Sequence, residues 1–244
     1  MLLALLLSVA VGLSLGLLGG GGSILTLPIL LYALGMEEKS AIATSLLVVG
    51  ATSVAAVVTH ARAGNVQWRT GFWFAGAGAS GALVGGLLSE AVPARWLLRG
   101  FVLMMLGTSL AMLRGRGDAA AGGTFSAPRV VVTGSLLGVL TGMVGAGGGF
   151  VIVPALVLVG GLPMRQAVGT SLVVIATQSF AGFVGHATHV PVDYATAAGV
   201  IAAAMVGSVI GGRFAQRVPA VVLRRAFGVL VLAMAVYVGW KSAR

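Results

Sequence analysis

Long apolar runs account for most of the chain, and short polar or glycine-rich stretches separate them. A helix that spans a bilayer needs about 20 mostly apolar residues. Several of the runs are that long, which predicts an all-α integral membrane protein. The apolar segments cover residues 2–18, 23–34, 40–60, 71–89, 96–113, 130–144, 149–160, 166–186, 194–212 and 221–240.

Only small residues separate two pairs of neighbouring segments. The first pair is divided by GGGG at 19–22, and the second by GAGGG at 145–149. Each glycine weakens a helix by about 1 kcal/mol relative to alanine, so we expect a broken helix at both places. Each broken pair either crosses the bilayer once or forms a re-entrant hairpin whose two ends lie on one side.

The chain contains an internal duplication with an offset of 126 residues, because GGGGSILTLP at 19–28 returns as GAGGGFVIVP at 145–154. We infer two transmembrane repeats, 1–113 and 130–244, joined by a polar linker at 114–129. Duplicated halves that each contain a glycine-interrupted span are typical of secondary transporters with a site between the repeats. The same offset aligns Gly35 with Gly161, Thr44-Ser45-Leu46 with Thr170-Ser171-Leu172, Ser53 with Ser179, and His60 with His186.

The positive charges favour one topology, since Lys and Arg are enriched on the cytoplasmic side of membrane proteins. A single crossing for each broken pair would divide these residues evenly between the two sides. Hairpins instead place most of them on one side, and most of the acidic residues on the other. We therefore expect inverted repeats, each with a re-entrant hairpin and three full spans. The linker at 114–129 would then be cytoplasmic, and both termini of this multi-pass inner-membrane protein would face away from the cytoplasm.

The composition excludes several classes of protein. Hydrophobic residues make up 58% of the 244 residues and charged residues 8%, whereas roughly 25% of an ordinary soluble domain is charged. A soluble enzyme and a disordered chain are therefore excluded. The net charge is +10, but the basic residues are scattered between apolar runs, which argues against nucleic-acid binding. Cysteine is absent, and we expect no metal site and no cofactor. The apolar start at 1–18 lacks the basic residues of a secretory signal, so we expect it in the mature protein.

The glycine breaks are the first candidate site. A glycine-rich turn that leads into a helix presents backbone N–H groups at the positive end of the helix dipole, and these groups can bind an anion without a charged side chain. The alternative is close packing of helices, which needs small residues only at every fourth position, as at Gly81 and Gly85 or at Gly207 and Gly211. The candidate residues in the breaks are Gly21, Gly22, Ser23, Gly147, Gly148 and Gly149.

Side chains in the next span of each repeat supply further hydrogen-bond donors. Thr44 and Ser45 are aligned with Thr170 and Ser171, and their hydroxyls would complete a polar cage around an oxyanion. The alternative is a hydrogen bond to a backbone carbonyl one turn earlier, which Ser and Thr commonly make in helices. Gln178 follows two turns later, and its uncharged amide N–H groups also suit an anion.

His60 and His186 are paired ionisable residues at predicted helix ends. A gate, a proton-linked switch and a helix-end hydrogen bond are the alternatives for them. No Asp or Glu lies within a predicted span, which argues against a cation substrate and against a carboxylate proton relay. An inside-negative potential favours anion export by about 2.3 kcal/mol per charge for each 100 mV.

Several motifs together resemble the sulfite exporter TauE/SafE family over nearly the whole chain. They are the repeated G-x-G-G-G/S-x-x-x-x-P element, the T-S-L that follows 16 residues later, the histidine that ends that helix, and the central basic linker. The resemblance implies a polytopic inner-membrane permease for sulfite, organosulfonates or related sulfur oxyanions, usually an exporter.

The sequence therefore predicts an alternating-access transporter whose partners are a small anion and the lipid bilayer, with no nucleic acid. A homodimer stays open. The alternatives are an anion channel, a permease for a different small anion, and a membrane scaffold or intramembrane enzyme. An enzyme would need a nucleophile–base pair or a metal set within the spans, and only combinations of Ser and His exist there.

Overall fold

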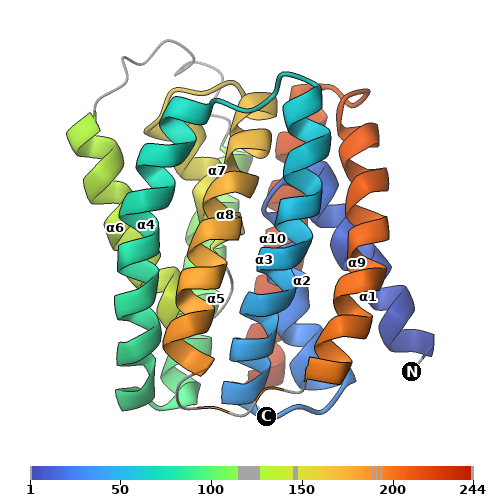
Figure 1. Cartoon of the computed structure of the whole chain (residues 1–244), viewed down its shortest axis with the longest axis vertical. Coiled ribbons are helices and arrows are strands. Elements are labelled where there is room, and N and C mark those ends of the chain that lie inside the picture. Colours follow the sequence, from blue (N-terminus) through green and yellow to red (C-terminus); the bar gives the residue numbers. More distant parts are fainter. Residues whose placement is uncertain are drawn as a thin grey trace.

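The structure is a computed structural model that describes residues 2–114, 127–144, 148–187, 190, 192 and 194–242 (Figure 1). Within these residues the chain forms helices joined by short connections, and it forms no strand. The helices are α1 (Leu2–Leu18), α2 (Gly21–Pro28), α3 (Glu38–Arg62), α4 (Trp68–Leu88), α5 (Ala94–Leu113), α6 (Ala127–Val144), α7 (Gly149–Leu158), α8 (Met164–Ala187), α9 (Tyr194–Ala215) and α10 (Ala220–Ser242).

Prolines mark several helix boundaries. Pro93 directly precedes α5 and Pro219 directly precedes α10, where the fixed φ of proline suits the start of a helix. Pro28 is the last residue of α2, and a π-helical turn, Ile29–Ala33, follows it. The equivalent residue of the second half, Pro154, lies inside the regular helix α7, so proline alone does not account for the change of helix type.

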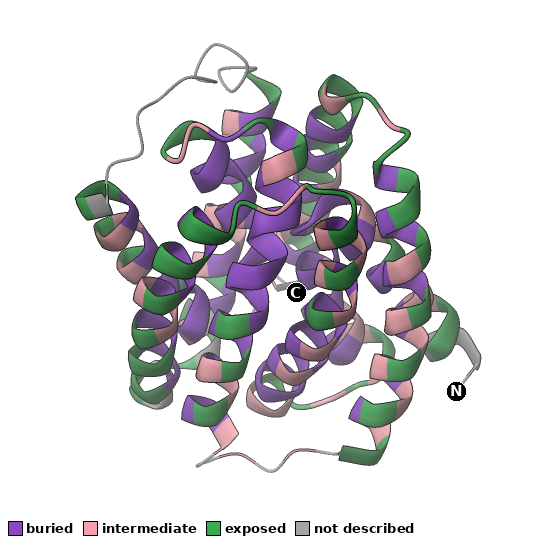
Figure 2. Ribbon diagram, turned by 45° about the horizontal axis from the view of Figure 1, so that its top comes forward, coloured by how far each residue is buried: buried purple, intermediate pink, exposed green. Residues whose placement is uncertain are grey.

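Within the described residues, six helices are long and apolar enough to cross a membrane: α3, α4, α5, α8, α9 and α10. The shorter apolar helices α1, α2, α6 and α7 form the two broken pairs. Large apolar side chains such as Phe72, Leu103 and Val132 are more than half exposed, and exposed residues cover the outer faces of the helices (Figure 2). Such a surface suits lipid rather than water, so the prediction of a multi-pass, all-helical membrane protein is confirmed.

The helices form a front row with a second group behind it (Figure 1). Successive contacts join α6 to α4, α4 to α8, α8 to α3, and α3 to α9 along this row, and the row continues to α1, which lies behind α9 in Figure 1. Behind this row α5 packs against α10, and α2 packs against α7. In addition, α2 contacts α10, and α7 contacts α5. The central pair α3 and α8 is the most enclosed, with 67% and 72% of their apolar spans buried.

Glycines bring neighbouring helices of the front row into backbone contact. A Cβ atom added at Gly81 of α4 would collide with the carbonyl oxygen of Ser135 in α6. A Cβ at Gly207 of α9 would collide in the same way with the carbonyl of Val9 in α1. Gly81 aligns with Gly207 and Val9 with Ser135 at the 126-residue offset. The duplicated sequence therefore makes the same contact in two places. The predicted packing role of these glycines is confirmed.

Three connections meet at one end of the bundle, the upper end in Figure 1. The side-chain amide of Gln67, between α3 and α4, donates to Oε1 of Gln166 at the start of α8 (3.2 Å). Arg165, in the first turn of α8, donates from Nη2 to the carbonyl of Val218, between α9 and α10 (3.1 Å). Several basic residues lie at this end, at the ends of four helices and in one connection, namely Arg62, Arg69, Arg165, Arg213 and Arg217.

Replacing Gly207 with alanine will destabilise the protein, because the new methyl group overlaps the backbone of α1. Overpacking of this kind costs about 1–3 kcal/mol, and a lowered midpoint of thermal unfolding in detergent measures it. Gly199→Ala in the same helix is the matched control, since a Cβ there meets nothing within 4 Å. Equal unfolding midpoints for the two variants would contradict the packing role.

Candidate functional site

Both predicted breaks interrupt a helix. In the first, α1 ends at Leu18 and α2 begins at Gly21, and Gly19 between them has a φ of +76°, a conformation that residues with a Cβ rarely adopt. In the second, Gly148 has a φ of +68° and α7 begins at the next residue. Gly147 lies outside the described residues.

The two breaks touch each other. A Cβ at Gly20 would collide with the carbonyl of Gly149, and a Cβ at Gly149 would lie 2.9 Å from Oγ of Ser23. The N-cap residues of α2 and α7 are glycines, and no side chain caps either helix. The first-turn N–H groups of a helix have no partner within that helix, so the meeting point concentrates backbone donors.

Close packing explains more of these glycines than the sequence suggests. Gly20 lies against α7, and a Cβ at Gly22 would collide with Leu15 of the preceding helix. The argument that packing needs only every fourth position is therefore wrong for this break, because successive glycines face different neighbours. The packing and the presentation of N–H groups act at the same place and do not exclude each other.

One face of α8 covers both breaks. A Cβ at Gly19 would lie 2.7 Å from Oγ of Ser171, and one at Gly149 would lie 2.8 Å from Cδ1 of Ile175. Residues 171, 175 and 178 follow the i, i+4, i+7 spacing that places side chains on the same side of a helix. Gln178 therefore extends the face that Ser171 begins. Ser171 and Gln178, both predicted from the sequence, are brought together with the breaks.

Gln178 is the most polar buried side chain of this face. Oγ1 of Thr141 in α6 donates to Oε1 of Gln178 at 3.4 Å, and Gly148 packs against Thr141. The amide nitrogen of Gln178 lies over Gly78 of α4, where any Cβ would collide with it. Gln178 is 1% exposed, and its Nε2 has no hydrogen-bond partner in the described structure. A buried donor without a partner costs about 1–3 kcal/mol, which a bound acceptor would remove.

Thr141 is a residue of the site that the sequence reasoning missed. The duplication could have revealed this residue, because the 126-residue offset aligns the polar Thr141 with the apolar Leu15. A polar residue that replaces an apolar one, a few residues before the glycine run, marks a difference between the two halves. Gly78 was also missed, and only the neighbouring side chain of Gln178 reveals its role.

The predicted hydroxyl pairs do not form one cage. Leu46 of α3 packs on Gly182, which lies 11 residues beyond Ser171, a rise of about 16 Å along α8. The pair Thr44 and Ser45 therefore lies far along the bundle from Thr170 and Ser171. Ser171 meets the break of the other half, at Gly19.

Each hydroxyl of these pairs has its own local surroundings. Ser45 donates to the carbonyl of Ile42 (2.8 Å) and Ser171 to that of Val168 (2.7 Å), the back-bonding that was the alternative interpretation. Thr170 accepts a hydrogen bond from the backbone N–H of Gln67 (2.9 Å), so it fastens the α3–α4 connection. Oγ1 of Thr44 is buried without a partner among the described residues.

Two further buried hydroxyls lie close to the centre. Ser53 and Ser179 occupy equivalent positions, are fully buried, and have no partner in the part of the chain that is described. Leu46 packs on Gly182, so α3 and α8 cross near these serines and next to Gln178. The crossing of the two central helices therefore holds several polar atoms that lack a hydrogen bond.

The paired histidines bond to the helices that break. Nε2 of His60 donates to the carbonyl of Gly16 (2.8 Å), and Nε2 of His186 donates to that of Gly142 (2.9 Å). In an unbroken α1, the N–H of Gly20 would bond to the Gly16 carbonyl, but it donates to Leu18 instead (2.9 Å). His60 therefore satisfies a carbonyl that the break leaves free. A gate, a proton-linked switch and a helix-end hydrogen bond were the alternatives for the histidines, and the observed geometry is that of a helix-end hydrogen bond.

The two histidines differ in their second ring nitrogen. Nδ1 of His186 lies 3.3 Å from the hydroxyl of Ser89, whose single proton is donated either to this nitrogen or to the carbonyl of Gly86 (2.6 Å). Nδ1 of His60 is buried and has no partner among the residues that the structure describes, and the position equivalent to Ser89 is Ala215. Ser89 was not among the residues selected from the sequence.

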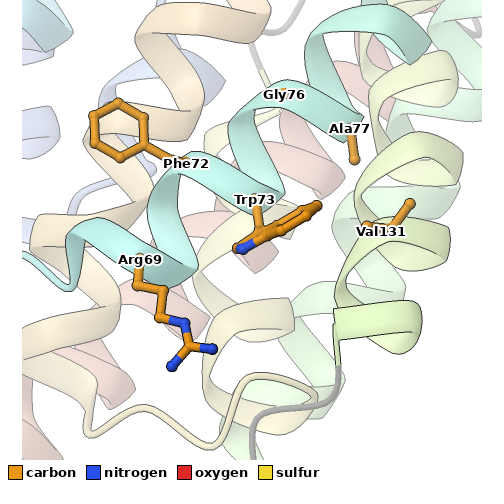
Figure 3. A pocket seen from close by; sticks show the side chains of 6 residues that line it. All are labelled: Arg69, Phe72, Trp73, Gly76, Ala77 and Val131. Atoms are coloured by element: carbon orange, nitrogen blue, oxygen red, sulfur yellow. The ribbon is translucent and has the colours of Figure 1, made fainter.

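A cavity of about 430 Å³ on the outer surface is a different feature. Arg69, Phe72 and Trp73 of α4 line it together with Val131 of α6, and Figure 3 shows Trp73 lying between the two helices. Phe72 and Trp73 are 63% and 52% exposed, so this groove opens toward the lipid. It does not reach the helix breaks.

Sequence comparison finds relatives over nearly the full length. The family described as "Sulfite exporter TauE/SafE" matches residues 4–238. The chain is 39% identical over 240 residues to a "Probable membrane transporter protein" of Xylella fastidiosa strain 9a5c, covering 95% of this chain and 92% of the relative. It is 29% identical over 231 residues to the "Probable membrane transporter protein YdhB" of Bacillus subtilis, covering 92% and 94%. No solved structure matches.

Replacing either histidine with leucine will lower the stability of the protein. His60→Leu leaves the Gly16 carbonyl buried without a donor, which costs about 1–3 kcal/mol, and His186→Leu does the same at Gly142. Thermal unfolding in detergent measures the loss. Ala215→Ser, which offers His60 a hydroxyl where His186 has Ser89, will keep or raise the unfolding midpoint. A His60→Leu variant as stable as the parent would show that the bond is unimportant.

Proposed function

Because the chain belongs to the sulfite exporter TauE/SafE family, we propose that it exports sulfite, an organosulfonate or a related sulfur oxyanion across the inner membrane by alternating access. At the level of the family the protein is a membrane transporter, and its relatives carry names of the same kind. The proposal of a sulfur oxyanion rests on the family's name and on the uncharged donors around the helix breaks.

The proposal includes two inverted repeats, 1–113 and 130–244. Gly71 contacts Thr170 and Gly86 lies against Gly182, so α4 and α8 run in the same direction. Since α3 and α4 are joined by a short connection and run oppositely, α3 is antiparallel to its equivalent α8 (Figure 1). Opposite directions of equivalent helices support a two-fold axis in the membrane plane, as in inverted-repeat transporters.

The basic end of the bundle is proposed to be cytoplasmic, following the enrichment of Arg and Lys on that side of membrane proteins. Arg62, Arg69, Arg165 and Arg213 lie at this end, whereas Glu37 lies at the other. The described ends of the chain, at the start of α1 and the end of α10, lie in the lower part of Figure 1, away from the basic end. This arrangement supports a first re-entrant hairpin, α1–α2, that enters from the non-cytoplasmic side and a second, α6–α7, that enters from the cytoplasmic side.

In the proposed site, the substrate lies where the breaks meet and where α8 covers them. The N–H groups at the starts of α2 and α7 bind the oxyanion, and the amide of Gln178 supplies a side-chain donor. The observation that carries this proposal is the buried Nε2 of Gln178, which has no partner in the described structure. An oxyanion has several acceptor atoms. Because the anion itself is charged, the hydrogen bonds that it accepts from neutral donors are stronger than bonds between two neutral groups.

The contacts between helices support the proposal of alternating access. Backbone contacts at glycines join α1 to α9 and α6 to α4, so each of these pairs moves as a unit with its neighbour α3 or α8. The α3–α8 contact is made by side chains, including Leu46 against Gly182, and it can change more readily. Among the described residues beside the breaks, Ser23, Ser171 and Gln178 are at most 1% exposed, which favours an occluded transporter over an open anion channel.

Gln178→Met will lower sulfite transport while keeping the shape of the side chain. Loss of one hydrogen bond to a charged ligand weakens binding about tenfold to a hundredfold. Sulfite efflux from proteoliposomes measures it, with the unfolding midpoint as a check of folding. The matched control is Thr52→Val at the equivalent position, because Thr52 already donates to the carbonyl of Val48 (2.7 Å). Unchanged efflux in Gln178→Met would rule out this site.

Sulfite and methanesulfonate will raise the unfolding midpoint of the detergent-solubilised protein, because a ligand that binds only the folded state stabilises it. Ammonium and choline at the same ionic strength will not. The shift will be smaller in Gln178→Met. If both anions leave the midpoint unchanged at millimolar concentration, a different substrate class is transported.

A further inference from the structure

A second groove lies on the outer surface, between α3 and α9 at the basic end of the bundle. Its volume is about 320 Å³, and it is separate from the helix breaks. The residues that line it and that carry the argument are Val58, Thr59, Arg62, Val209, Arg213 and Gln216.

The groove changes from apolar to basic along its length. Val58 and Val209 lie on its membrane side, and Val58 is 46% exposed to the bilayer. Arg62 is the last residue of α3, and Arg213 lies in the last turn of α9. Both helices end at the same end of the bundle, so the two guanidinium groups stand together where the apolar part stops.

Nothing in the described structure neutralises these two arginines. No carboxylate of the described residues pairs with Arg62 or Arg213, and both are exposed. Glu37 and Glu38 lie at the opposite end of the bundle. Two guanidinium groups in one groove repel each other. An anion bound between them would offset this repulsion, because each guanidinium group would donate charge-assisted hydrogen bonds to it.

Helix packing does not require this charge. The equivalent pair of helices, α8 and α4, makes the same kind of contact at the other end of the bundle. There the position equivalent to Arg213 is Leu87, and the position equivalent to Thr59 is Gly185. The positions equivalent to Arg62 and Gln216 are Thr188 and Glu90. The two basic residues are therefore specific to the groove at the basic end, although the equivalent helices pack together in the same way.

We propose that this groove binds an anionic phospholipid from the surrounding leaflet. Arg62 and Arg213 bind the phosphate, Thr59 and Gln216 supply neutral donors beside it, and an acyl chain lies along Val58 and Val209. Basic pockets between membrane helices bind anionic headgroups in this way. A lipid fits better than a free anion because the apolar part of the groove opens to the bilayer. The inference requires only that the chain spans a membrane.

The position of the groove links the lipid to the helices that surround the first break. A Cβ at Gly212, next to Arg213, would lie 3.0 Å from Thr59 and 3.6 Å from the ring of His60. His60 in turn bonds to Gly16 of α1. A lipid that joins Arg62 to Arg213 therefore holds α3 and α9 together beside this bond.

Binding is tested with the full chain purified in neutral detergent, using native mass spectrometry with phosphatidylglycerol and, for comparison, phosphatidylcholine. Arg62→Gln combined with Arg213→Gln will weaken phosphatidylglycerol binding roughly tenfold to thirtyfold, since each basic residue contributes separately. The control, Arg217→Gln combined with Arg225→Gln, removes the same charge from exposed positions outside the groove and will keep the affinity. Equal affinities for the two double variants would overturn the proposal.

Two further measurements distinguish a lipid from a soluble anion. Val209→Trp fills the apolar part of the groove and will weaken phosphatidylglycerol binding, whereas glycerol 1-phosphate, which has the headgroup chemistry without acyl chains, will not compete. Efficient competition by glycerol 1-phosphate, or full lipid binding by Val209→Trp, would identify a site for soluble phosphate esters and overturn the proposal. Unfolding midpoints without added lipid check that each variant is folded.

Discussion

In the interior of a bilayer, a backbone carbonyl that has no hydrogen-bond donor carries a large energetic cost, because no water is present to supply one. The glycine break after α1 creates such a carbonyl at Gly16, and His60 donates to it. His186 makes the equivalent bond to Gly142. The breaks are therefore tolerated at this depth because side chains from α3 and α8 complete the hydrogen bonding of α1 and α6. The site between the breaks depends on these two bonds.

The same glycines set the geometry of that site. Backbone contact at Gly20 brings the start of α2 against the start of α7, so two helix N-termini adjoin without a charged residue between them. Ser171 and Gln178 of α8 lie over the contact. Neutral donors in a dry environment act more strongly than in water, because the local dielectric constant is low. This combination is suited to an anion and unsuited to a cation.

The sequence predicts the features that depend on local rules. The length of an apolar run indicates a membrane helix, a run of glycines indicates a break, and the 126-residue offset indicates two similar halves. Contacts between distant elements are not local, and these were missed. Thr170 accepts a bond from Gln67, and Ser171 meets Gly19 of the other half. Because α3 and α8 run in opposite directions, residues that align in sequence but are distant from the crossing of the two helices lie apart in space. Family membership follows from the motifs and is confirmed.

Polar residues that are present in only one of the two halves indicate where a substrate could bind. Packing contacts recur at the 126-residue offset, since the fold needs them twice. The polar pair Thr141 and Gln178 does not recur, because Leu15 and Thr52 stand in its place and Thr52 bonds to its own helix. A duplicated protein retains a polar residue in only one half when the fold does not require it. The proposed substrate would therefore bind to one side of the proposed two-fold axis, nearer to the second break, although the packing contacts around it recur in both halves.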